Sequence, residues 1–210
     1  MTQLEAEPAS AAEVFGDQIE RARAFTAALA EHGEERGLIG PLELPRLWTR
    51  HILNSAVASP LFSGRVGDVG SGAGLPGLVL AIARPDVEWV LIEPMERRTV
   101  WLSEQVAALE LPNVEVVRAR GEDWQGAGSL DMVTARAVSA LRTLLPFTAP
   151  LVRPGGELAL LKGANVSNEI GAAAKQIRRY GLIDARVEVV GEGIVSEPTR
   201  VFRARVRTPA

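Results

Sequence analysis

The stretch Asp68-Val-Gly-Ser-Gly-Ala-Gly-Leu-Pro-Gly77 lies between a short apolar run and the apolar segment 78–83. This order predicts a strand, a glycine turn and a helix. The four glycines of the stretch let the backbone adopt positive φ angles, and they leave no Cβ between the chain and a ligand. A nucleotide-like cofactor can therefore lie directly against the turn, close to the free N–H groups at the start of the helix.

Two cofactors fit such a turn. Residues 72–77 form a literal G-x-G-x-x-G, the fingerprint of dinucleotide-binding proteins. However, an additional glycine, Gly70, precedes the fingerprint, and Asp68 stands two residues before it, where its carboxylate can face the cationic methionine end of S-adenosylmethionine. The resulting Asp-x-Gly-x-Gly-x-Gly pattern resembles the first motif of Rossmann-like methyltransferases. It favours S-adenosylmethionine over NAD.

The composition suits one α/β domain with a helical extension. The chain has 210 residues, of which 47% are apolar, and this is enough for a buried core. It has no cysteine, which excludes disulfides and zinc–thiolate sites and favours a reducing cytoplasm. No apolar run approaches about 18 residues and the N-terminus is acidic, so we expect neither a membrane span nor a signal peptide. His32 and His51 have no second ligand at a suitable spacing, so no metal is expected.

Charge is distributed unevenly along the chain, although the net charge is only −3. Residues 1–135 contain 11 Lys and Arg against 20 Asp and Glu, whereas residues 136–210 contain 12 against 6. Such an asymmetry indicates contact with a polyanion such as nucleic acid. A solvated surface with scattered charge is the alternative explanation.

We expect a disordered leader at residues 1–10, an N-terminal helical cap at 11–62, and a methyltransferase-type domain at 63–210 that forms one globular unit with the cap. Apolar spacing predicts cap helices at 11–32 and 47–57. From residue 65 strands alternate with helices, which predicts a mostly parallel sheet covered on both faces. The expected strands are 65–69, 88–93, 114–118, 130–135 and 156–162, and the expected helices are 76–84, 95–110, 139–152 and 167–180. Segments 185–190 and 199–206 are predicted to form a terminal antiparallel pair, which completes a seven-stranded sheet.

Several polar residues follow the predicted strand ends, the edge at which open α/β sheets bind ligands. Glu93 ends the second strand, where a carboxylate can accept hydrogen bonds from both ribose hydroxyls of an adenosine. Gly121 and Glu122 follow the third strand and can meet the adenine ring. Arg136 follows the fourth strand, where enzymes that methylate exocyclic amines often carry Asn/Asp-Pro-Pro-Tyr. Because an arginine offers only donors, Arg136 suits an acceptor-rich target or the cofactor carboxylate.

The absence of a plausible base points to a target atom that needs none. Guanine N7 has an exposed lone pair, so it can attack a sulfonium methyl without prior deprotonation. Catalysis then consists of alignment and exclusion of water. Basic side chains could hold RNA phosphate, and among them we select Lys162 and Arg200.

Taken together, these features resemble the bacterial small-subunit ribosomal RNA guanine-N7 methyltransferases, historically called the glucose-inhibited division protein B family. The resemblance covers roughly residues 15–207. Its motifs are Arg50-His-Ile-Leu-Asn-Ser55, residues 68–77, Ile92-Glu-Pro94 with Arg97-Arg98, Arg120-Gly-Glu122, Ala135-Arg-Ala137 and Leu161-Lys-Gly163. The segment 37–41 departs from the Asn-Leu-Thr run that is usual in the family, and Asn54 and Glu93 stand where Asp is frequent.

The resemblance implies a class I S-adenosylmethionine-dependent methyltransferase whose product is 7-methylguanosine in 16S ribosomal RNA of the small subunit. The implied cofactor residues are Gly70, Leu75, Glu93, Gly121, Glu122 and Arg136, to which the turn itself adds Asp68, Gly72 and Gly74. The expected RNA contacts are His51, Lys162 and Arg200. No single residue receives a predicted catalytic role.

Two other classes of function stay open at this point. An NAD-dependent oxidoreductase would use the literal fingerprint, but the chain lacks a Tyr-x-x-x-Lys pair, since its one tyrosine is Tyr180. A non-catalytic ribosome- or RNA-binding protein would keep the fold and bind RNA with a steep salt dependence. For the methyltransferase we expect a cytoplasmic monomer.

Overall fold

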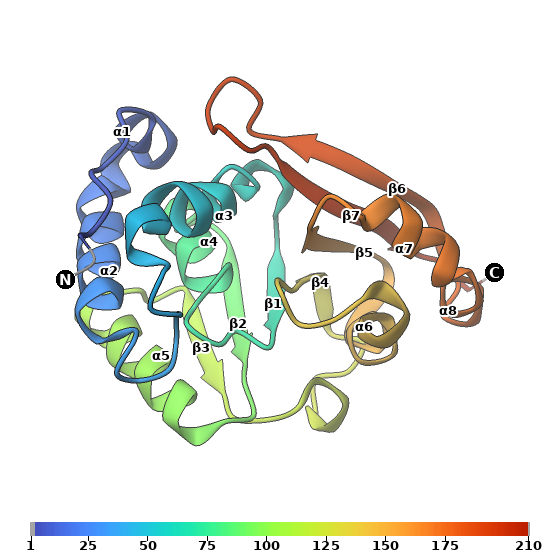
Figure 1. Ribbon diagram of the computed structural model, residues 1–210. Helices are drawn as coiled ribbons and strands as arrows, with labels where there is room; N and C mark the ends of the chain where they lie inside the picture. Colours follow the sequence, from blue (N-terminus) through green and yellow to red (C-terminus); the bar gives the residue numbers. More distant parts are fainter. Residues whose placement is uncertain (1–2, 210) are drawn as a thin grey trace.

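The computed structural model describes residues 3–209. At its centre lies a seven-stranded sheet with the strand order β3-β2-β1-β4-β5-β7-β6 (Figure 1). The strands are β1 (Arg65–Val69), β2 (Glu88–Ile92), β3 (Val114–Val117), β4 (Leu130–Thr134), β5 (Val152–Lys162), β6 (Leu182–Val190) and β7 (Thr199–Val206). Strands β1 to β5 pair in parallel, and β7 is antiparallel to both β5 and β6. The predicted mostly parallel sheet with a terminal antiparallel pair is confirmed.

Helices cover both faces of the sheet (Figure 1). One face carries α1 (Ser10–Phe15), α2 (Ile19–His32), α4 (Gly77–Ala83) and α5 (Glu96–Ala108), and the other carries α6 (Leu141–Thr148), α7 (Val166–Ala172) and α8 (Ala174–Arg179). Strand β2 shows the division, because Leu91 packs in the first apolar cluster while Val90 and Ile92 pack in the second. A strand buried on both sides needs apolar residues at successive positions, which explains its continuous apolar run.

The strand order reverses between β1 and β4. From β1 the chain proceeds outward through β2 to β3, and it then returns across the sheet to β4 on the other side of β1. In open α/β sheets ligands bind outside the carboxyl ends of the strands at such a reversal. The glycine turn follows β1 directly and therefore lies at this place.

The cap is less regular than the two helices predicted at 11–32 and 47–57. Gly16, with φ of 50°, ends α1, so the first predicted helix is interrupted. The remaining cap elements are η1 (Gly16–Gln18), η2 (Leu44–Arg46), η3 (Leu47–Leu53), α3 (Asn54–Ala56) and η4 (Ser59–Leu61). Of these, η3 is a π-helix, a form that is rare and frequently found at functional sites. It carries Arg50 and His51, whose contacts are described below.

The leader was predicted to be disordered over residues 1–10. Residues 1–2 lie outside the described residues, but the part that follows packs on the cap. The Glu5 amide donates to the Leu44 carbonyl oxygen at 2.9 Å, and the Glu5 carboxylate accepts from the Thr49 amide at 3.0 Å. Glu7 forms an ion pair of 2.7 Å with Arg23. These contacts correct the prediction for residues 5–7, because acidic side chains find donors that the sequence pattern does not show.

In the C-terminal half, several element boundaries differ from those predicted. Strand β5 begins at Val152 rather than 156, because η6 (Ala149–Leu151) ends the preceding helix early. The helix expected at 167–180 is divided at Ala173 into α7 and α8. No helix within residues 3–209 has both the length and the apolarity needed to cross a membrane.

Candidate cofactor and substrate site

The glycine turn needs its glycines for conformation and for packing. Gly70, Gly72 and Gly74 have φ angles of 74°, 56° and 94°, a region that residues with a side chain rarely adopt. At Gly77, which begins α4, a Cβ would lie 2.4 Å from Cδ2 of Leu91. The sequence pattern thus identified a turn that no other residue type fits.

One part of the turn is open to a ligand. A Cβ on Gly72 would have the Gly70 carbonyl oxygen, 3.7 Å away, as its nearest neighbour. A Cβ on Gly70 would instead lie 3.0 Å from Val138, which is in the loop between β4 and α6. This loop therefore lies over the start of the turn. Cofactor contacts of Gly70, Gly72, Gly74 and Leu75 stay predictions that agree with this shape.

Asp68 is fully buried beneath the turn. Its Oδ2 atom accepts a hydrogen bond of 3.0 Å from the Gly77 amide, whereas its Oδ1 atom is buried without a partner. Burial raises the pKa of Asp68 to about 7. A buried carboxylate with one unsatisfied oxygen fits a cationic ligand, as predicted for the methionine end of the cofactor.

Glu93 is almost completely buried at the end of β2. Its Oε2 atom accepts from the Gly72 amide at 3.0 Å, and its Oε1 atom accepts from the Met95 amide at 2.9 Å. In this arrangement Glu93 supports the glycine turn. Each carboxylate oxygen accepts one of these bonds and keeps a second lone pair, so the ribose contact stays a prediction that does not require them to break.

We expect Glu93→Ala to weaken binding of S-adenosylmethionine at least tenfold, which corresponds to about 1.4 kcal/mol. The variant loses an acceptor for ribose and also leaves the Gly72 amide without its partner. Calorimetric titration with the cofactor measures the change. Glu93→Gln keeps one acceptor oxygen and should lose less, and an unchanged affinity in Glu93→Ala would contradict both roles.

Gly121 and Glu122 lie in η5 (Gly121–Asp123), after β3. Gly121 is buried, and a Cβ there would lie 2.8 Å from the Phe147 carbonyl oxygen at the end of α6. Glu122 is exposed. The structure therefore explains the glycine by packing, and the adenine contact of both residues stays a prediction.

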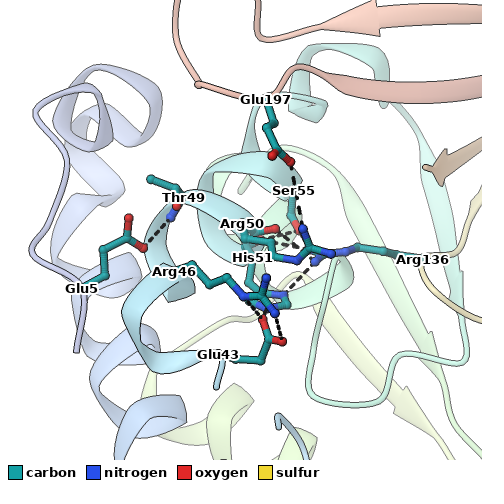
Figure 2. A network of polar contacts seen from close by, with 9 residues as sticks. All are labelled: Glu5, Glu43, Arg46, Thr49, Arg50, His51, Ser55, Arg136 and Glu197. Atoms are coloured by element: carbon teal, nitrogen blue, oxygen red, sulfur yellow. Dashed lines mark hydrogen bonds and ion pairs between the residues drawn. The ribbon is translucent and has the colours of Figure 1, made fainter. Parts of the chain in front are cut away.

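Arg136 follows β4, and its guanidinium points into the cap (Figure 2). One terminal nitrogen donates to Ser55 Oγ at 2.8 Å and to the His51 carbonyl oxygen at 3.1 Å. The other donates to the Arg50 carbonyl oxygen at 3.1 Å and contacts His51 Nδ1 at 2.7 Å. These donors are occupied by the cap, so the predicted contact with the cofactor carboxylate has no support in this geometry. Burial lowers the pKa of Arg136 to about 10, which leaves it charged at pH 7.

His51 lies between Arg136 and Glu43 (Figure 2). Because Arg136 can only donate, His51 Nδ1 must accept, and Nε2–H then donates to Glu43 Oε2 at 2.6 Å. Burial and the charge of Arg136 lower the pKa of His51, so the ring is neutral at pH 7. Both ring nitrogens are engaged, which corrects the predicted RNA contact: His51 positions Arg136 instead. Glu43 lies in a segment without a recognisable motif, so its contact with His51 could not be predicted from the sequence.

A cavity of about 650 Å³ opens beside the strand ends of β4, β5 and β7. This volume is in the range of small-molecule binding sites. Four basic side chains line it: Arg50, Arg136, Lys162 and Arg200. The sequence predicted Lys162 and Arg200 as RNA contacts, and both lie here. Three further residues line the same cavity, although the sequence analysis predicts no role for them: Asn54 from the cap, and Ser196 and Glu197 from the loop between β6 and β7.

Lys162 has local partners in addition to its place in the cavity wall. Its ammonium forms an ion pair of 2.9 Å with Glu169 and donates to the Ser139 carbonyl oxygen at 2.7 Å. Ser139 is next to Val138, the residue that lies over Gly70. Lys162 therefore fastens the β4–α6 loop above the glycine turn, whereas Arg200 has no such tether to that loop.

The site can hold a nucleoside cofactor and an acceptor side by side. The glycine turn, Asp68 and Glu93 lie at β1 and β2, and the basic cavity lies at β4, β5 and β7, with Arg136 between them. Within residues 3–209 no group of three His, Cys, Asp or Glu side chains is placed to hold a metal ion. The open side of Gly72 and the unpartnered oxygen of Asp68 are the features that fit S-adenosylmethionine.

A family model described as rRNA small subunit methyltransferase G matches residues 18–197. The chain belongs to this family. The ribosomal RNA small subunit methyltransferase G of Leifsonia xyli is 66% identical over 97% of this chain and 98% of that protein. The protein of the same name from Corynebacterium glutamicum is 48% identical over 94% of this chain and 91% of its own length. Membership confirms the resemblance stated above, and it confirms a methyltransferase against the NAD-dependent alternative.

Solved structures agree with this assignment at the level of the fold. A SAM dependent methyltransferase from Aquifex aeolicus superposes with a TM-score of 0.57 at 19% identity, over 83% of this chain and 97% of that one. M. jannaschii TYW2 in complex with AdoMet gives a TM-score of 0.59 at 18% identity, over 78% of both chains. The predicted class I methyltransferase fold is thereby confirmed for this member of the methyltransferase G family.

Proposed function

We propose that this protein transfers the methyl group of S-adenosylmethionine to N7 of one guanine in 16S ribosomal RNA of the small subunit. The observation that carries the proposal is the basic cavity next to the glycine turn, in a chain whose relatives are named ribosomal RNA small subunit methyltransferases. Cationic walls attract and hold RNA phosphate. The volume of about 650 Å³ suits a single nucleotide turned out of its stack.

When bound, S-adenosylmethionine supplies an electrophilic methyl group on a sulfonium. The chain supplies position rather than proton transfer, because guanine N7 attacks through a free lone pair. Asp68 and Glu93 hold the turn on the donor side, and Arg136, fixed by His51 and Ser55, forms the border with the acceptor cavity. Fixing both reactants in line and excluding water is enough to accelerate such a transfer.

The direct test is transfer of labelled methyl from S-adenosylmethionine to small ribosomal subunits prepared from cells that lack this gene. Borohydride reduction followed by aniline cleavage then maps the label, because this chemistry cuts RNA at 7-methylguanosine. We expect label at one guanine of 16S RNA. Label on an exocyclic amine would contradict the proposed atom. RNA binding without any transfer would favour a non-catalytic ribosome-binding protein.

We propose further that the protein acts as a cytoplasmic monomer in which residues 11–62 and 63–210 unfold together. Joint unfolding is supported by the apolar cluster that both parts share, in which Phe25 and Ile52 of the cap pack with Leu78 and Trp101 of the main domain. One cooperative unfolding transition and the mass of one chain of 22.5 kDa by light scattering are the expected results. Two separate transitions would contradict the shared unit.

Replacing Lys162 and Arg200, two of the four basic residues that line the cavity, should separate two roles. Arg200→Ala should weaken binding to small subunits and lower the dependence of log affinity on log salt by about one unit, with cofactor affinity unchanged. Lys162→Ala should weaken cofactor binding as well, because it releases the loop that lies over Gly70. Filter binding and calorimetry measure the two affinities. If both variants lost cofactor affinity to the same degree, the separate roles assigned to Lys162 and Arg200 would be contradicted.

A further inference from the structure

One acidic residue interrupts the basic wall of the cavity. Among the described residues that line it, Glu197 is the one carboxylate, beside Arg50, Arg136, Lys162 and Arg200. A site that only had to hold phosphate would gain nothing from a negative charge at this place. Glu197 therefore indicates a ligand that brings hydrogen-bond donors as well as phosphate.

Glu197 is free to meet such a ligand. It lies in the loop between β6 and β7, and its side chain is 79% exposed. Its contact with Arg50 of η3 spans 4.0 Å, the limit of an ion pair (Figure 2). Exposed pairs of this kind hold their side chains weakly, so a ligand can separate them easily.

A second unused acceptor lies in the same wall. The Oδ1 atom of Asn54 is buried and has no hydrogen-bond partner. Asn54 lines both the large cavity and a smaller one of about 120 Å³, together with Arg50, Ser196 and Glu197, so these four residues lie between the two. A buried acceptor without a partner is costly, which points to a donor supplied by the ligand.

We propose that Glu197 selects guanine by accepting hydrogen bonds from N1–H and the 2-amino group of the base. This inference rests on the proposed function and names how the site recognises its base. Guanine presents these two donors side by side on its Watson–Crick edge, and a carboxylate with two acceptor oxygens is their complement. Adenine presents no donor at N1 and none at C2, so it leaves the carboxylate unpaired.

The sheet places Glu197 on the correct side for this role. The cofactor site lies at β1, the cavity extends across β4 and β5, and Glu197 directly precedes β7 on the far side. In guanine, N7 lies on the edge of the ring opposite to N1 and the 2-amino group. A base held by Glu197 therefore turns N7 toward the glycine turn and leaves its lone pair free to attack.

Inosine tests the proposal, because it lacks the 2-amino group and retains N7. Once the methylated guanine is mapped, 16S RNA can be ligated with inosine at that position and reconstituted into small subunits. We expect the wild-type protein to methylate these subunits with a kcat/KM at least tenfold lower than guanine subunits, since a site built to bond a donor rejects its absence. In Glu197→Ala, guanine and inosine subunits should react at the same reduced rate.

Two variants serve as controls. Glu192→Ala removes an exposed carboxylate from the same loop and should keep the full discrimination of the wild type. Glu197→Gln keeps one acceptor oxygen and should discriminate to an intermediate degree. Calorimetry with S-adenosylmethionine should give the wild-type affinity in every variant, which shows that each has folded.

The outcomes separate this inference from the function on which it rests. A wild-type protein that transfers no methyl to guanine subunits overturns the proposed function. A wild-type protein that accepts inosine as readily as guanine, or a Glu197→Ala variant that still discriminates fully, overturns the role of Glu197 and leaves the proposed function standing.

Discussion

Asp68→Asn is expected to raise the melting temperature of the cofactor-free protein and to weaken binding of S-adenosylmethionine at least tenfold. The substitution removes a charge that is fully buried and has one unsatisfied oxygen. An asparagine can still accept the hydrogen bond from the Gly77 amide through its oxygen. It cannot attract the cationic end of the cofactor, and this loss explains the lower affinity.

The stability change depends on pH in a defined direction. The pKa of Asp68 rises from 3.8 to about 7 on folding, so between these values the folded protein binds more protons than the unfolded chain. Stability is therefore lost as pH rises through this window, by at most about 4 kcal/mol at 1.4 kcal/mol per pKa unit. The gain from Asp68→Asn should be large at pH 8 and absent at pH 4.

Thermal unfolding at the two pH values measures this effect. At pH 8 we expect a net gain of about 2 kcal/mol, because the new amide N–H offsets part of the effect. For a chain of this length, at about 2–4 °C per kcal/mol, the melting temperature should then rise by about 4–8 °C. Glu122→Gln, an exposed change near the same strand ends, should leave it unaltered. A lower melting temperature in Asp68→Asn at pH 8 would contradict the claim that the buried charge of Asp68 destabilises the folded protein.

Arg136→Gln is expected to lower the free energy of unfolding by about 3 kcal/mol, the usual cost of breaking a buried charged network. The variant removes the guanidinium that donates hydrogen bonds to Ser55 Oγ, to His51 Nδ1 and to two carbonyl oxygens of η3. The pKa of His51 should rise, because the nearby positive charge that lowers it is gone. Urea unfolding and an NMR titration of the imidazole measure these changes.

The dependence on pH gives a second readout of the same network. In the wild type the pKa of His51 lies below 6.5, so the unfolded chain takes up the proton first and stability falls as pH drops below 6.5. In Arg136→Gln this fall should be smaller. Arg46→Gln, which removes an exposed partner of Glu43, should change stability by less than about 0.5 kcal/mol. Equal losses in both variants would contradict the role assigned to Arg136.

The sheet was predictable because its strands carry the pattern locally. The apolar run predicts β2, and the glycine pattern predicts the turn after β1, each from a few neighbouring residues. The π-helix at Leu47–Leu53 was not predictable, because its apolar spacing is equally compatible with an α-helix. The break at Ala173 follows Gly171 by two residues, but an isolated glycine within a helical pattern does not by itself predict where a helix ends. Such departures follow from tertiary packing, and the apolar periodicity of a segment carries no information about that packing.

The candidate site divides in the same way. Topology alone puts Asp68, Glu93 and Arg136 at one edge of the sheet, and the sequence identified all three. The direction of the Arg136 side chain depends on His51 and Ser55, which are 85 and 81 residues away in the chain. The sequence pattern pairs none of these residues, so the guanidinium was assigned to the cofactor instead of the cap.

The split of the site across β4 also has an evolutionary consequence. Methyl-donor residues come from the segments around β1 and β2, whereas the acceptor cavity is closed by the loop between β6 and β7, more than a hundred residues later in the gene. The hairpin is not independent of the cap, because Thr199 Oγ1 donates to the Asn54 carbonyl oxygen at 2.7 Å. Exposed loop side chains such as Glu197 can therefore vary most freely, and we expect changes of acceptor to arise there while the residues around β1 and β2 stay the same.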